Sequence, residues 1–319
     1  MHLVGRYVRI KVLGTAAGGG IPQWNCNCPN CAAVRSGRLP SRRVASLAVT
    51  ADGQRWILVN AGCDISAQLA ATASLWPTRK RSSPIAALLL TDANIDHAAG
   101  LLEFRQAPAF SIWSTTLVKD TLTAAPMFAR FADSPHSWRT FDAKPEAARC
   151  DLPEIDGLAI SAIPVPGRMP SYAGDAQHAS ATVAYRFEHM GASAVYAPIF
   201  LAVDDKLMHE AARADAVFLD GTCWTDDEMI QRGLGTRTAR DMGHAPMIGP
   251  GGSLDDMRRL RARYRYYTHV NNSNPILDPA SAQASELAAA GFAVPDDGLE
   301  IVLDGDHATD VYSRADDVR

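Results

Sequence analysis

One acidic residue and two histidines, carried by two separate segments, form the residue set in this sequence best suited to bind a catalytic metal ion. The run Leu88–Gly100 (LLLTDANIDHAAG) passes from an apolar segment into a loop where Asp96 and His97 are adjacent, and Tyr267–Pro275 (YTHVNNSNP) supplies His269. Two histidines and one carboxylate are the ligand set of non-haem iron(II) oxygenases, which need open positions. The same ligands can hold zinc and activate water for hydrolysis. The residues therefore predict a metal site and leave the metal open.

Three clustered cysteines predict a second metal site, of a structural kind. Cys26, Cys28 and Cys31 lie in the segment CNCPNC. In a cytosolic protein such clustering favours zinc binding by thiolates, and the alternatives are a disulfide plus a free thiol or three reduced structural cysteines. A fourth ligand must come from elsewhere in the chain. A closed, thiolate-rich site would fix a loop that has little apolar surface of its own.

Asp220 and His244 are candidates for proton transfer. Asp220 lies in Phe218–Thr222 (FLDGT), where an apolar run ends in an acid, and His244 ends the segment DMGH. A carboxylate that orients an imidazole is the usual way to fix a proton-transferring histidine. His178 follows a Gly-Asp turn just before another apolar run and is a further candidate. For a lone histidine, a purely structural role is the competing interpretation.

Short apolar or β-branched runs bounded by Gly, Pro, Asn or Asp predict the strands that must position these loops. The predicted strands are Val8–Gly14, Arg43–Thr50, Arg55–Asn60, Ala86–Thr91, Phe110–Ser114, Leu158–Ile163, Ala181–Phe187, Ala194–Ala197, Ala216–Asp220 and Tyr264–His269. Helical patterns are predicted at Ile65–Leu75, Asp204–Arg213, Thr225–Gln231, Leu254–Arg263 and Ser281–Ala290. Strands dominate the first half and strand–helix alternation the second, which favours a single α/β sandwich with helices outside two sheets.

The composition is that of a globular protein and argues against several classes of function. Of 319 residues, 47% are hydrophobic and 21% are charged, and the net charge of −4 offers no basic footprint for nucleic acid. The basic run Arg258–Tyr267 (RRLRARYRYY) is expected to be the solvated face of a helix that passes into a strand. No apolar run approaches the roughly 20 residues of a membrane-spanning helix. Because residues 1–8 lack the features of a secretory signal, we expect a cytoplasmic protein with no membrane or nucleic-acid partner.

The triplet Gly18-Gly19-Gly20 after the first predicted strand could suggest a dinucleotide site. That fingerprint needs G-x-G-x-x-G at the start of a helix and an acidic residue after the next strand. The following segment Ile21–Trp24 (IPQW) opens no helix. We therefore expect a tight turn that lets the backbone approach a neighbour or a ligand.

Taken together, five motifs resemble the PqqB family of pyrroloquinoline quinone (PQQ) biosynthesis. They are Val12–Cys28, Leu90–His97, Leu219–Thr222, Met242–His244 and Thr268–Pro275, and the first and last are highly specific. The resemblance extends from about residue 8 to Leu303. It implies the αββα sandwich of the metallo-β-lactamase fold in a domain of residues 1–303, with a zinc knot at about residues 24–31. Residues 304–319 are expected to form a flexible tail without a function of its own.

The resemblance also implies which residues hold the metals. A structural zinc is implied on Cys26, Cys28 and Cys31, and Asn272 lies where a related phosphodiesterase branch places its fourth zinc ligand. An open iron site is implied on Asp96, His97 and His269. Asp220 and His244 match the acid and histidine that assist proton transfer elsewhere in the fold.

Three positions depart from the hydrolytic members of that fold, whose loop reads His-x-His-x-Asp-His. Asp92 and Asn94 stand at the two leading His positions, and Pro198 stands where those members place a bridging Asp. We therefore expect the first site of the two-metal hydrolases to be absent. Asp92 and Asn94, together with His178, are expected to line the pocket.

The leading hypothesis is an Fe²⁺- and O₂-dependent hydroxylase of a tyrosine-like or other amino-acid- or peptide-derived intermediate in PQQ or related natural-product biosynthesis. Zn²⁺ or Mn²⁺ are the alternative metals of the open site. A metal-dependent hydrolase of cyclic phosphodiesters or activated amides, and a non-catalytic carrier of the product, are the alternative functions. Asn60–Ile65 (NAGCDI) departs from the Asn-Ala-Ser-Pro-Asp pattern expected of the family, so a paralogue in another pathway is a further alternative. The expected partners are the small substrate and O₂, with a homodimer as an open alternative.

Overall fold

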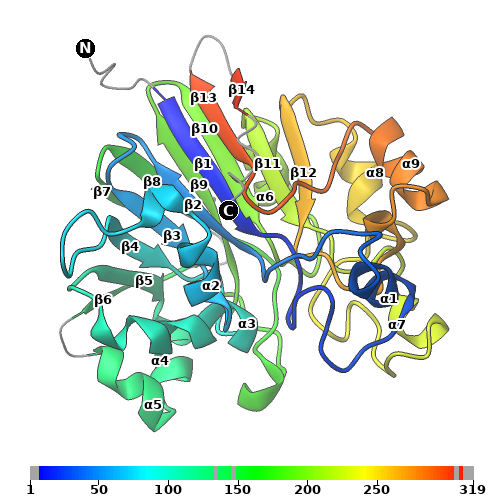
Figure 1. Ribbon diagram of the computed structural model, residues 1–319, viewed down its shortest axis with the longest axis horizontal. Coiled ribbons are helices and arrows are strands. Elements are labelled where there is room, and N and C mark those ends of the chain that lie inside the picture. Colours follow the sequence, from blue (N-terminus) through cyan, green and yellow to red (C-terminus); the bar gives the residue numbers. More distant parts are fainter. Residues whose placement is uncertain (1–6, 133–135, 145–148, 305–308, 312–319) are drawn as a thin grey trace.

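Two β-sheets form the framework of the protein, and the computed structural model describes residues 7–132, 136–144, 149–304 and 309–311. The first sheet contains β1 (Tyr7–Gly14), β2 (Ser46–Thr50), β3 (Trp56–Val59), β4 (Ile85–Leu89), β5 (Ser111–Thr115), β6 (Ser137–Phe141), β13 (Glu300–Asp304) and β14 (Thr309–Val311). The second contains β7 (Cys150–Ile155), β8 (Leu158–Pro164), β9 (Val183–His189), β10 (Ala192–Ala197), β11 (Ala216–Asp220) and β12 (Tyr264–Thr268). Their orders are β14-β13-β1-β2-β3-β4-β5-β6 and β12-β11-β10-β9-β8-β7 (Figure 1).

The main core lies between the two sheets. Alternate residues of β1, such as Val8 and Ile10, are buried there, because successive side chains of a strand point to opposite faces. Tyr185 and Phe187 of β9 and Phe218 of β11 belong to the same buried cluster. Both sheets therefore share one core, which agrees with the expected single domain.

Helices cover the outer faces of both sheets. Beside the first sheet lie α2 (Ile65–Ala70), α3 (Ile95–Ala98), α4 (Thr116–Thr123) and α5 (Pro126–Ala129), with the 3₁₀ turns η1 (Ala73–Leu75), η2 (Ala99–Gln106) and η3 (Arg130–Ala132). Beside the second lie α6 (Asp205–Ala211), α8 (Ser253–Met257) and α9 (Ala282–Ala289). The remaining helices are α1 (Pro29–Arg35), α7 (Glu228–Gln231), η4 (Ser171–Ala173) and η5 (Pro275–Leu277). The predicted αββα sandwich is confirmed.

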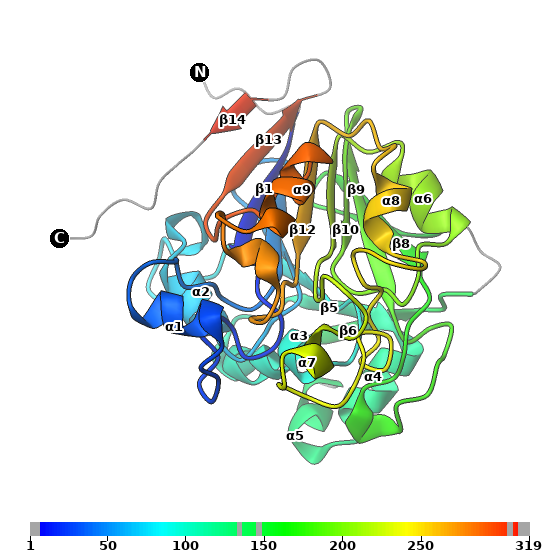
Figure 2. The ribbon, with the colours of Figure 1, turned by 90° about the vertical axis from the view of Figure 1, so that its right-hand side faces the viewer.

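Parallel strands bring the site-bearing loops to one end of the sandwich. Strands β3 to β6 pair in parallel, and so do β10, β11 and β12. Loops that follow parallel strands collect at the carboxyl edge of a sheet, where α/β proteins place their sites. In Figure 2 the segments beyond β12 lie close to α3 and α7 at that end.

Every predicted strand is present, but the helix predicted at Leu254–Arg263 is too long. Helix α8 ends at Met257, and the backbone N–H of Tyr264 already pairs with Asp215 O at the start of β12 (3.0 Å). Leu260 is buried although it lies in the loop between α8 and β12. A buried leucine at that position mimics the apolar spacing of a longer helix. The arginines at 258, 259, 261 and 263 are exposed, as the solvated-face interpretation predicts.

The predicted tail begins inside the sheet rather than after it. Asp304 is the last residue of β13, and Thr309–Val311 pair with that strand as β14. Residues 305–308 and 312–319 lie outside the described part of the chain, so the predicted flexibility of the tail stays a prediction. Among the described residues, no helix has the length and apolar character needed to cross a membrane.

Asp297 gives the fold a testable dependence on pH. Its carboxylate accepts hydrogen bonds from the backbone of Arg43 (2.6 Å) and from Thr15 (2.9 Å), but burial outweighs them and raises the pKa of Asp297 to about 6. Because this pKa is higher in the folded state than in the unfolded chain, the protonated carboxyl group stabilises the folded state fully at pH values below the unfolded-state pKa. That contribution is lost as the pH rises through about 6.

We expect Asp297→Asn to remove a decline in unfolding free energy on the order of 2 kcal/mol between pH 4 and pH 7. Urea unfolding at a series of pH values measures this decline, with Asp120→Asn, at an exposed position of α4, as the matched control. Parallel pH profiles for wild type and Asp297→Asn would show that this carboxyl group does not carry the effect.

Candidate metal centre

The loop after β4 holds His97 through a chain of hydrogen bonds. Asn60 donates to the Thr91 hydroxyl (2.9 Å), and that hydroxyl donates to Asp92 Oδ2 (2.7 Å). The same Asp92 oxygen lies 2.6 Å from His97 Nδ1. Asp92 and His97 are both fully buried. Asp92 therefore orients the His97 ring, and a carboxylate on Nδ1 leaves Nε2 for a metal. The expectation that Asp92 lines the pocket stays a prediction.

His269 directly follows β12 and meets Asp96 of α3, which follows β4 of the other sheet. His269 Nε2 lies 3.1 Å from Asp96 Oδ2, and Thr222 Oγ1 lies 2.8 Å from His269 Nδ1. The backbone of His269 has a φ of 55°, a left-handed conformation that costs a non-glycine residue free energy. Backbone hydrogen bonds between Val270 and both Thr15 and Ala17 hold this turn in place. Strain of this kind is concentrated at functional sites.

Asp96, His97 and His269 form one group that is suited to a metal ion. Their ligand atoms lie within 4.8 Å of one another. His97 Nε2 is buried and has no hydrogen-bond partner among the described residues, which is costly for a polar atom unless a ligand satisfies it. A Cβ at Gly18 would lie 3.1 Å from Asp96 Oδ2, so the glycine turn lets the backbone approach this carboxylate, as predicted. These features fit a bound cation.

The charged residues of the centre shift one another's pKa. Burial opposes the charged form of His97, but the carboxylates of Asp92 and Asp96 outweigh it and raise the pKa of His97 to about 9. Burial likewise opposes the charged form of Asp96, yet the neighbouring His97 and His269 lower the pKa of its carboxyl group. Burial lowers the pKa of His269, which keeps that ring neutral as a ligand must be. The carboxylates of Asp92, which is buried, and Asp96, which is partly exposed, are balanced by the positive charge of the protonated His97 ring, which a metal ion bound to the neutral ring would replace.

Asp220 and His244 form the predicted pair next to this group. Asp220 Oδ2 lies 2.7 Å from His244 Nδ1, and the His244 ring stacks on His269 with centroids 5.1 Å apart. Burial opposes the charged form of His244, but Asp220 outweighs it and raises the pKa. Asp220, His244 and His269 also have ligand atoms within 4.8 Å of one another, so His269 is common to two metal-capable groups. This second group was not predicted from the sequence.

Thr222 is a site residue that the sequence analysis did not single out. Its hydroxyl lies 2.7 Å from Asp220 Oδ1, 3.0 Å from His244 Nδ1 and 2.8 Å from His269 Nδ1. One hydroxyl therefore connects the acid to both rings. The sequence signal for this role is the place of Thr222 in the Asp-Gly-Thr motif, which begins at the last residue of β11.

Asn94 and His178, the other two residues predicted to line the pocket, lie in different parts of the structure. Asn94 donates to Asp92 Oδ1 through its backbone and its side chain, both at 2.8 Å, and it lines a small cavity beside the centre. His178 is exposed, and its Nδ1 accepts the backbone N–H of Ser180. The structure brings Asn94 to the site and leaves His178 outside both metal-capable groups.

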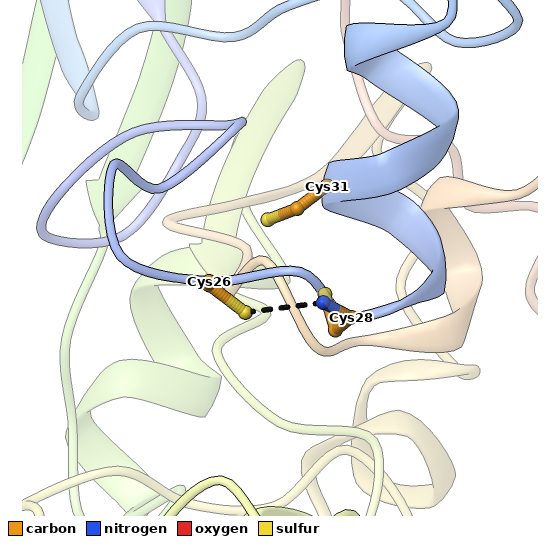
Figure 3. A group of neighbouring side chains, drawn as sticks. All are labelled: Cys26, Cys28 and Cys31. Carbon is orange, nitrogen blue, oxygen red and sulfur yellow. Dashed lines mark hydrogen bonds between the residues drawn. The ribbon is translucent and has the colours of Figure 1, made fainter.

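The three cysteines converge as the knot predicted from their spacing. Cys26, Cys28 and Cys31 are unpaired, and their sulfur atoms lie within 4.8 Å of one another. Figure 3 shows Cys26 and Cys28 on the loop before α1 and Cys31 on its first turn, with the Cys28 backbone N–H donating to Cys26 Sγ (3.4 Å). The side-chain amide of Asn272 lies 3.0, 3.6 and 3.3 Å from the sulfur atoms of Cys26, Cys28 and Cys31. This donor set fits a tetrahedral zinc ion.

A single short segment joins the knot to the metal centre. Asn272 follows His269 by three residues, and Asn30 of α1 donates to the backbone oxygens of Asn272 (3.0 Å) and Asn274 (2.8 Å). Asn274 in turn donates to Gly221 O (2.9 Å), beside the Asp220 pair. The position of His269 therefore depends on the geometry of the cysteine loop.

We expect Asp92→Asn to weaken metal binding at the centre by about 10–100-fold, because the group that orients a ligating histidine tunes the metal site. Zinc titration against a chelating dye measures the affinity, and Asp120→Asn, at an exposed position of α4, is the matched control. An unchanged affinity would mean that the Asp92–His97 contact does not support the site.

The fold and the two metal-capable groups at one end of the sandwich define a protein of the metallo-β-lactamase class. A family model described as a beta-lactamase superfamily domain matches residues 55–270. A diphosphatase of the PhnP family has the same fold, with a TM-score of 0.66, 19% identity and coverage of 92% of this chain and 96% of that one.

Similarity to individual proteins narrows this class to one family. Coenzyme PQQ synthesis protein B of Cupriavidus necator is 42% identical over 302 residues, covering 92% of this chain and 99% of the relative. The Ruegeria pomeroyi protein of the same description is 40% identical, covering 93% and 100%. The crystal structure of Zn²⁺-bound PqqB from Methylobacterium extorquens superposes with a TM-score of 0.85 at 34% identity, covering 92% of this chain and 99% of that one. The chain belongs to the PqqB family, as its motifs predict.

Proposed function

We propose that the protein is an iron(II)- and O₂-dependent hydroxylase that acts on an amino-acid- or peptide-derived intermediate in PQQ biosynthesis. The observation that carries this proposal is the group of Asp96, His97 and His269, in which one carboxylate and two imidazoles converge and a buried ring nitrogen has no partner among the described residues. Fe²⁺ held by such a set would supply the activation of O₂. Family membership supports the pathway.

The residues around this group would orient ligands and move protons. Asp92 holds His97 by its Nδ1 atom, and Thr222 holds His269 in the same way. His244 is suited to transfer a proton to or from the substrate, because Asp220 on its Nδ1 stabilises the charged ring while the other nitrogen stays available. These roles follow from contacts within the protein and are therefore the same for any bound substrate.

The cysteine knot would hold a structural zinc ion. The three thiolates supply a closed set with no role in turnover, and Asn272, whose side-chain amide contacts all three sulfur atoms, is proposed as the fourth ligand. The oxygen and nitrogen of an amide are assigned by their surroundings, so the side-chain oxygen can face the zinc. The zinc bound by the Methylobacterium extorquens relative supports a zinc-binding protein.

Oxygen consumption by the iron-loaded protein tests the proposed function. Fe²⁺ is added anaerobically, and O₂ uptake is followed with a panel of tyrosine-like amino acids and peptides, with ascorbate supplying the two electrons that reduce the second oxygen atom to water. The expected result is substrate-dependent uptake coupled to a hydroxylated product. Turnover with Zn²⁺ or Mn²⁺ in the absence of O₂ would instead identify a hydrolase, and product binding without turnover in any metal form would identify a carrier.

A further inference from the structure

A cavity beside the cysteine knot gives small molecules access to one side of the proposed zinc site. It has a volume of about 530 Å³, and Cys26, Cys28 and Asn272 of the knot form part of its wall. Met229 and Leu234 also line it. A cavity of this size admits small molecules as well as water. The residues of the metal centre do not line it, so the proposed reaction does not account for it.

The three cysteines of the knot differ in their exposure. Cys31 is fully buried and Cys28 is buried, whereas Cys26 is partly exposed. Figure 3 shows Cys26 on the loop that precedes α1 and Cys31 on the helix itself. Zinc keeps its cysteine ligands deprotonated, and an accessible thiolate is the form that oxidants attack. An oxidant that enters the cavity would therefore react first with Cys26.

The sulfur atoms lie close enough together for one oxidised cysteine to be attacked by another. All three cysteines are unpaired, and their sulfur atoms lie within 4.8 Å of one another. A side-chain amide such as that of Asn272 is not among the usual zinc ligands, so the thiolates supply most of the affinity. A disulfide within the knot would remove two of them and release the ion.

Release of zinc would affect the metal centre through Asn272. The side-chain amide of this residue contacts all three sulfur atoms, and its backbone oxygen accepts a hydrogen bond from Asn30 (3.0 Å) and lies 3.4 Å from Cys28 Sγ. His269 lies three residues earlier, in a left-handed conformation (φ 55°) that its surroundings must hold. Release of Asn272 would therefore remove a restraint on the turn that carries His269.

We propose that Cys26 is a site of reversible oxidation, at which hydrogen peroxide converts the knot into a disulfide, releases zinc and weakens metal binding at the centre. The Cys26 thiolate attacks one peroxide oxygen, the O–O bond breaks, and Cys26 becomes a sulfenic acid as hydroxide leaves. The thiolate of Cys28 or Cys31 then attacks Cys26 Sγ, and the S–O bond breaks with loss of a second hydroxide. Two thiolates thus lose two electrons, and the peroxide, with two protons, becomes two waters. This inference rests on the proposed zinc ion at the knot and does not depend on the hydroxylase reaction.

Peroxide treatment of the zinc-loaded protein tests the oxidation site. The full chain is first dialysed against a weak chelator, which leaves about one zinc per chain, held by the thiolates. Hydrogen peroxide is added with a chromophoric zinc chelator, and the cysteines are then alkylated and mapped by mass spectrometry. We expect release of about one zinc per chain and a disulfide that contains Cys26. A thiol reductant with added Zn²⁺ should restore the knot.

Variants that fill cavities test the route of the oxidant. Leu234→Trp places a larger side chain in the cavity beside the knot and should slow zinc release by at least about threefold, because access limits thiolate oxidation. Leu69→Trp is the matched control, since Leu69 lines a separate cavity of about 350 Å³, and it should release zinc as the wild type does. Cys63→Ser, which removes an exposed thiol outside the knot, should also leave the release unchanged. Thermal unfolding before peroxide is added checks that each variant keeps its fold.

Binding of Mn²⁺, followed by its electron paramagnetic resonance signal, measures the effect on the metal centre. Mn²⁺ prefers oxygen and nitrogen ligands, so it reports on Asp96, His97 and His269 and not on the cysteines. We expect the oxidised protein to bind Mn²⁺ at least about tenfold more weakly than the reduced, zinc-loaded protein.

Four results would each overturn the inference. They are zinc that stays bound in peroxide, zinc released while Cys26 stays reduced, equal release rates in Leu234→Trp and wild type, and an unchanged Mn²⁺ affinity after oxidation. None of these measurements needs iron or a substrate. A protein that releases zinc in the expected way but consumes no O₂ would therefore contradict the proposed function alone.

Discussion

Replacing His269 with alanine is expected to abolish iron binding and O₂-dependent turnover together. His269 is common to both metal-capable groups, and its ring contacts Asp96 while it stacks on His244. Loss of a direct ligand should exceed the effect of losing an orienting residue, so we expect iron affinity to fall by more than about 100-fold. Anaerobic titration with Fe²⁺ followed by oxygen-electrode measurements gives both quantities.

The control for this variant is His209→Ala, which removes an exposed histidine from α6. It should bind iron and consume O₂ as the wild type does. Thermal unfolding distinguishes loss of a ligand from loss of the fold, because a folded His269→Ala protein keeps a single cooperative transition. Iron affinity and turnover close to wild type in His269→Ala would remove this residue from the ligand set.

Replacing Cys31 with serine is expected to release zinc and to destabilise the whole protein. The sulfur of Cys31 is fully buried within the knot, and zinc bound there would contribute directly to the free energy of folding. We expect the unfolding free energy to fall by about 3–5 kcal/mol, in the range of large effects caused by loss of a metal. Metal analysis of the purified protein and urea unfolding measure the two effects.

The same variant should also weaken metal binding at the centre formed by Asp96, His97 and His269, because Asn272 connects the knot to His269. Cys63→Ser is the matched control, since Cys63 is exposed and lies outside the knot. It should retain zinc, stability and iron affinity. If Cys31→Ser keeps one zinc per chain, or if it loses zinc while the unfolding free energy stays unchanged, the knot is not the structural zinc site.

Residues that converge at the metal centre could be predicted from the sequence when their motif lies at the end of a strand. Asp96, His97 and His269 follow β4 and β12, which are apolar runs with clear boundaries. The sequence did not predict that Asp92 would turn inward to His97, because only the fold shows which neighbour a loop carboxylate meets. Thr222 was overlooked for the same reason, since a hydroxyl gains its role from the two rings and the acid around it.

Several of the elements that were not predicted from the sequence have weak patterns, although strand β13 and helix α4, which were also not predicted, do not. Strand β7 contains Pro153 and lies at a sheet edge, where proline is tolerated but disguises a strand. Strand β6 is mostly polar and also lies at an edge, and the seven-residue helix α1 begins at Pro29 within the cysteine loop. The overextended helix at 254–263 shows the converse error, because Leu260 is buried by tertiary packing and not by a helical face.

Isotopic labelling of the product tests the central claim most directly. The iron-loaded protein is supplied with isotopically heavy O₂ in ordinary water, and the product formed from an amino-acid- or peptide-derived substrate is analysed by mass spectrometry. The account predicts a new hydroxyl group that carries the heavy isotope, and no such product from His269→Ala. A product whose new oxygen comes from water, or one that forms equally well without O₂, would contradict it.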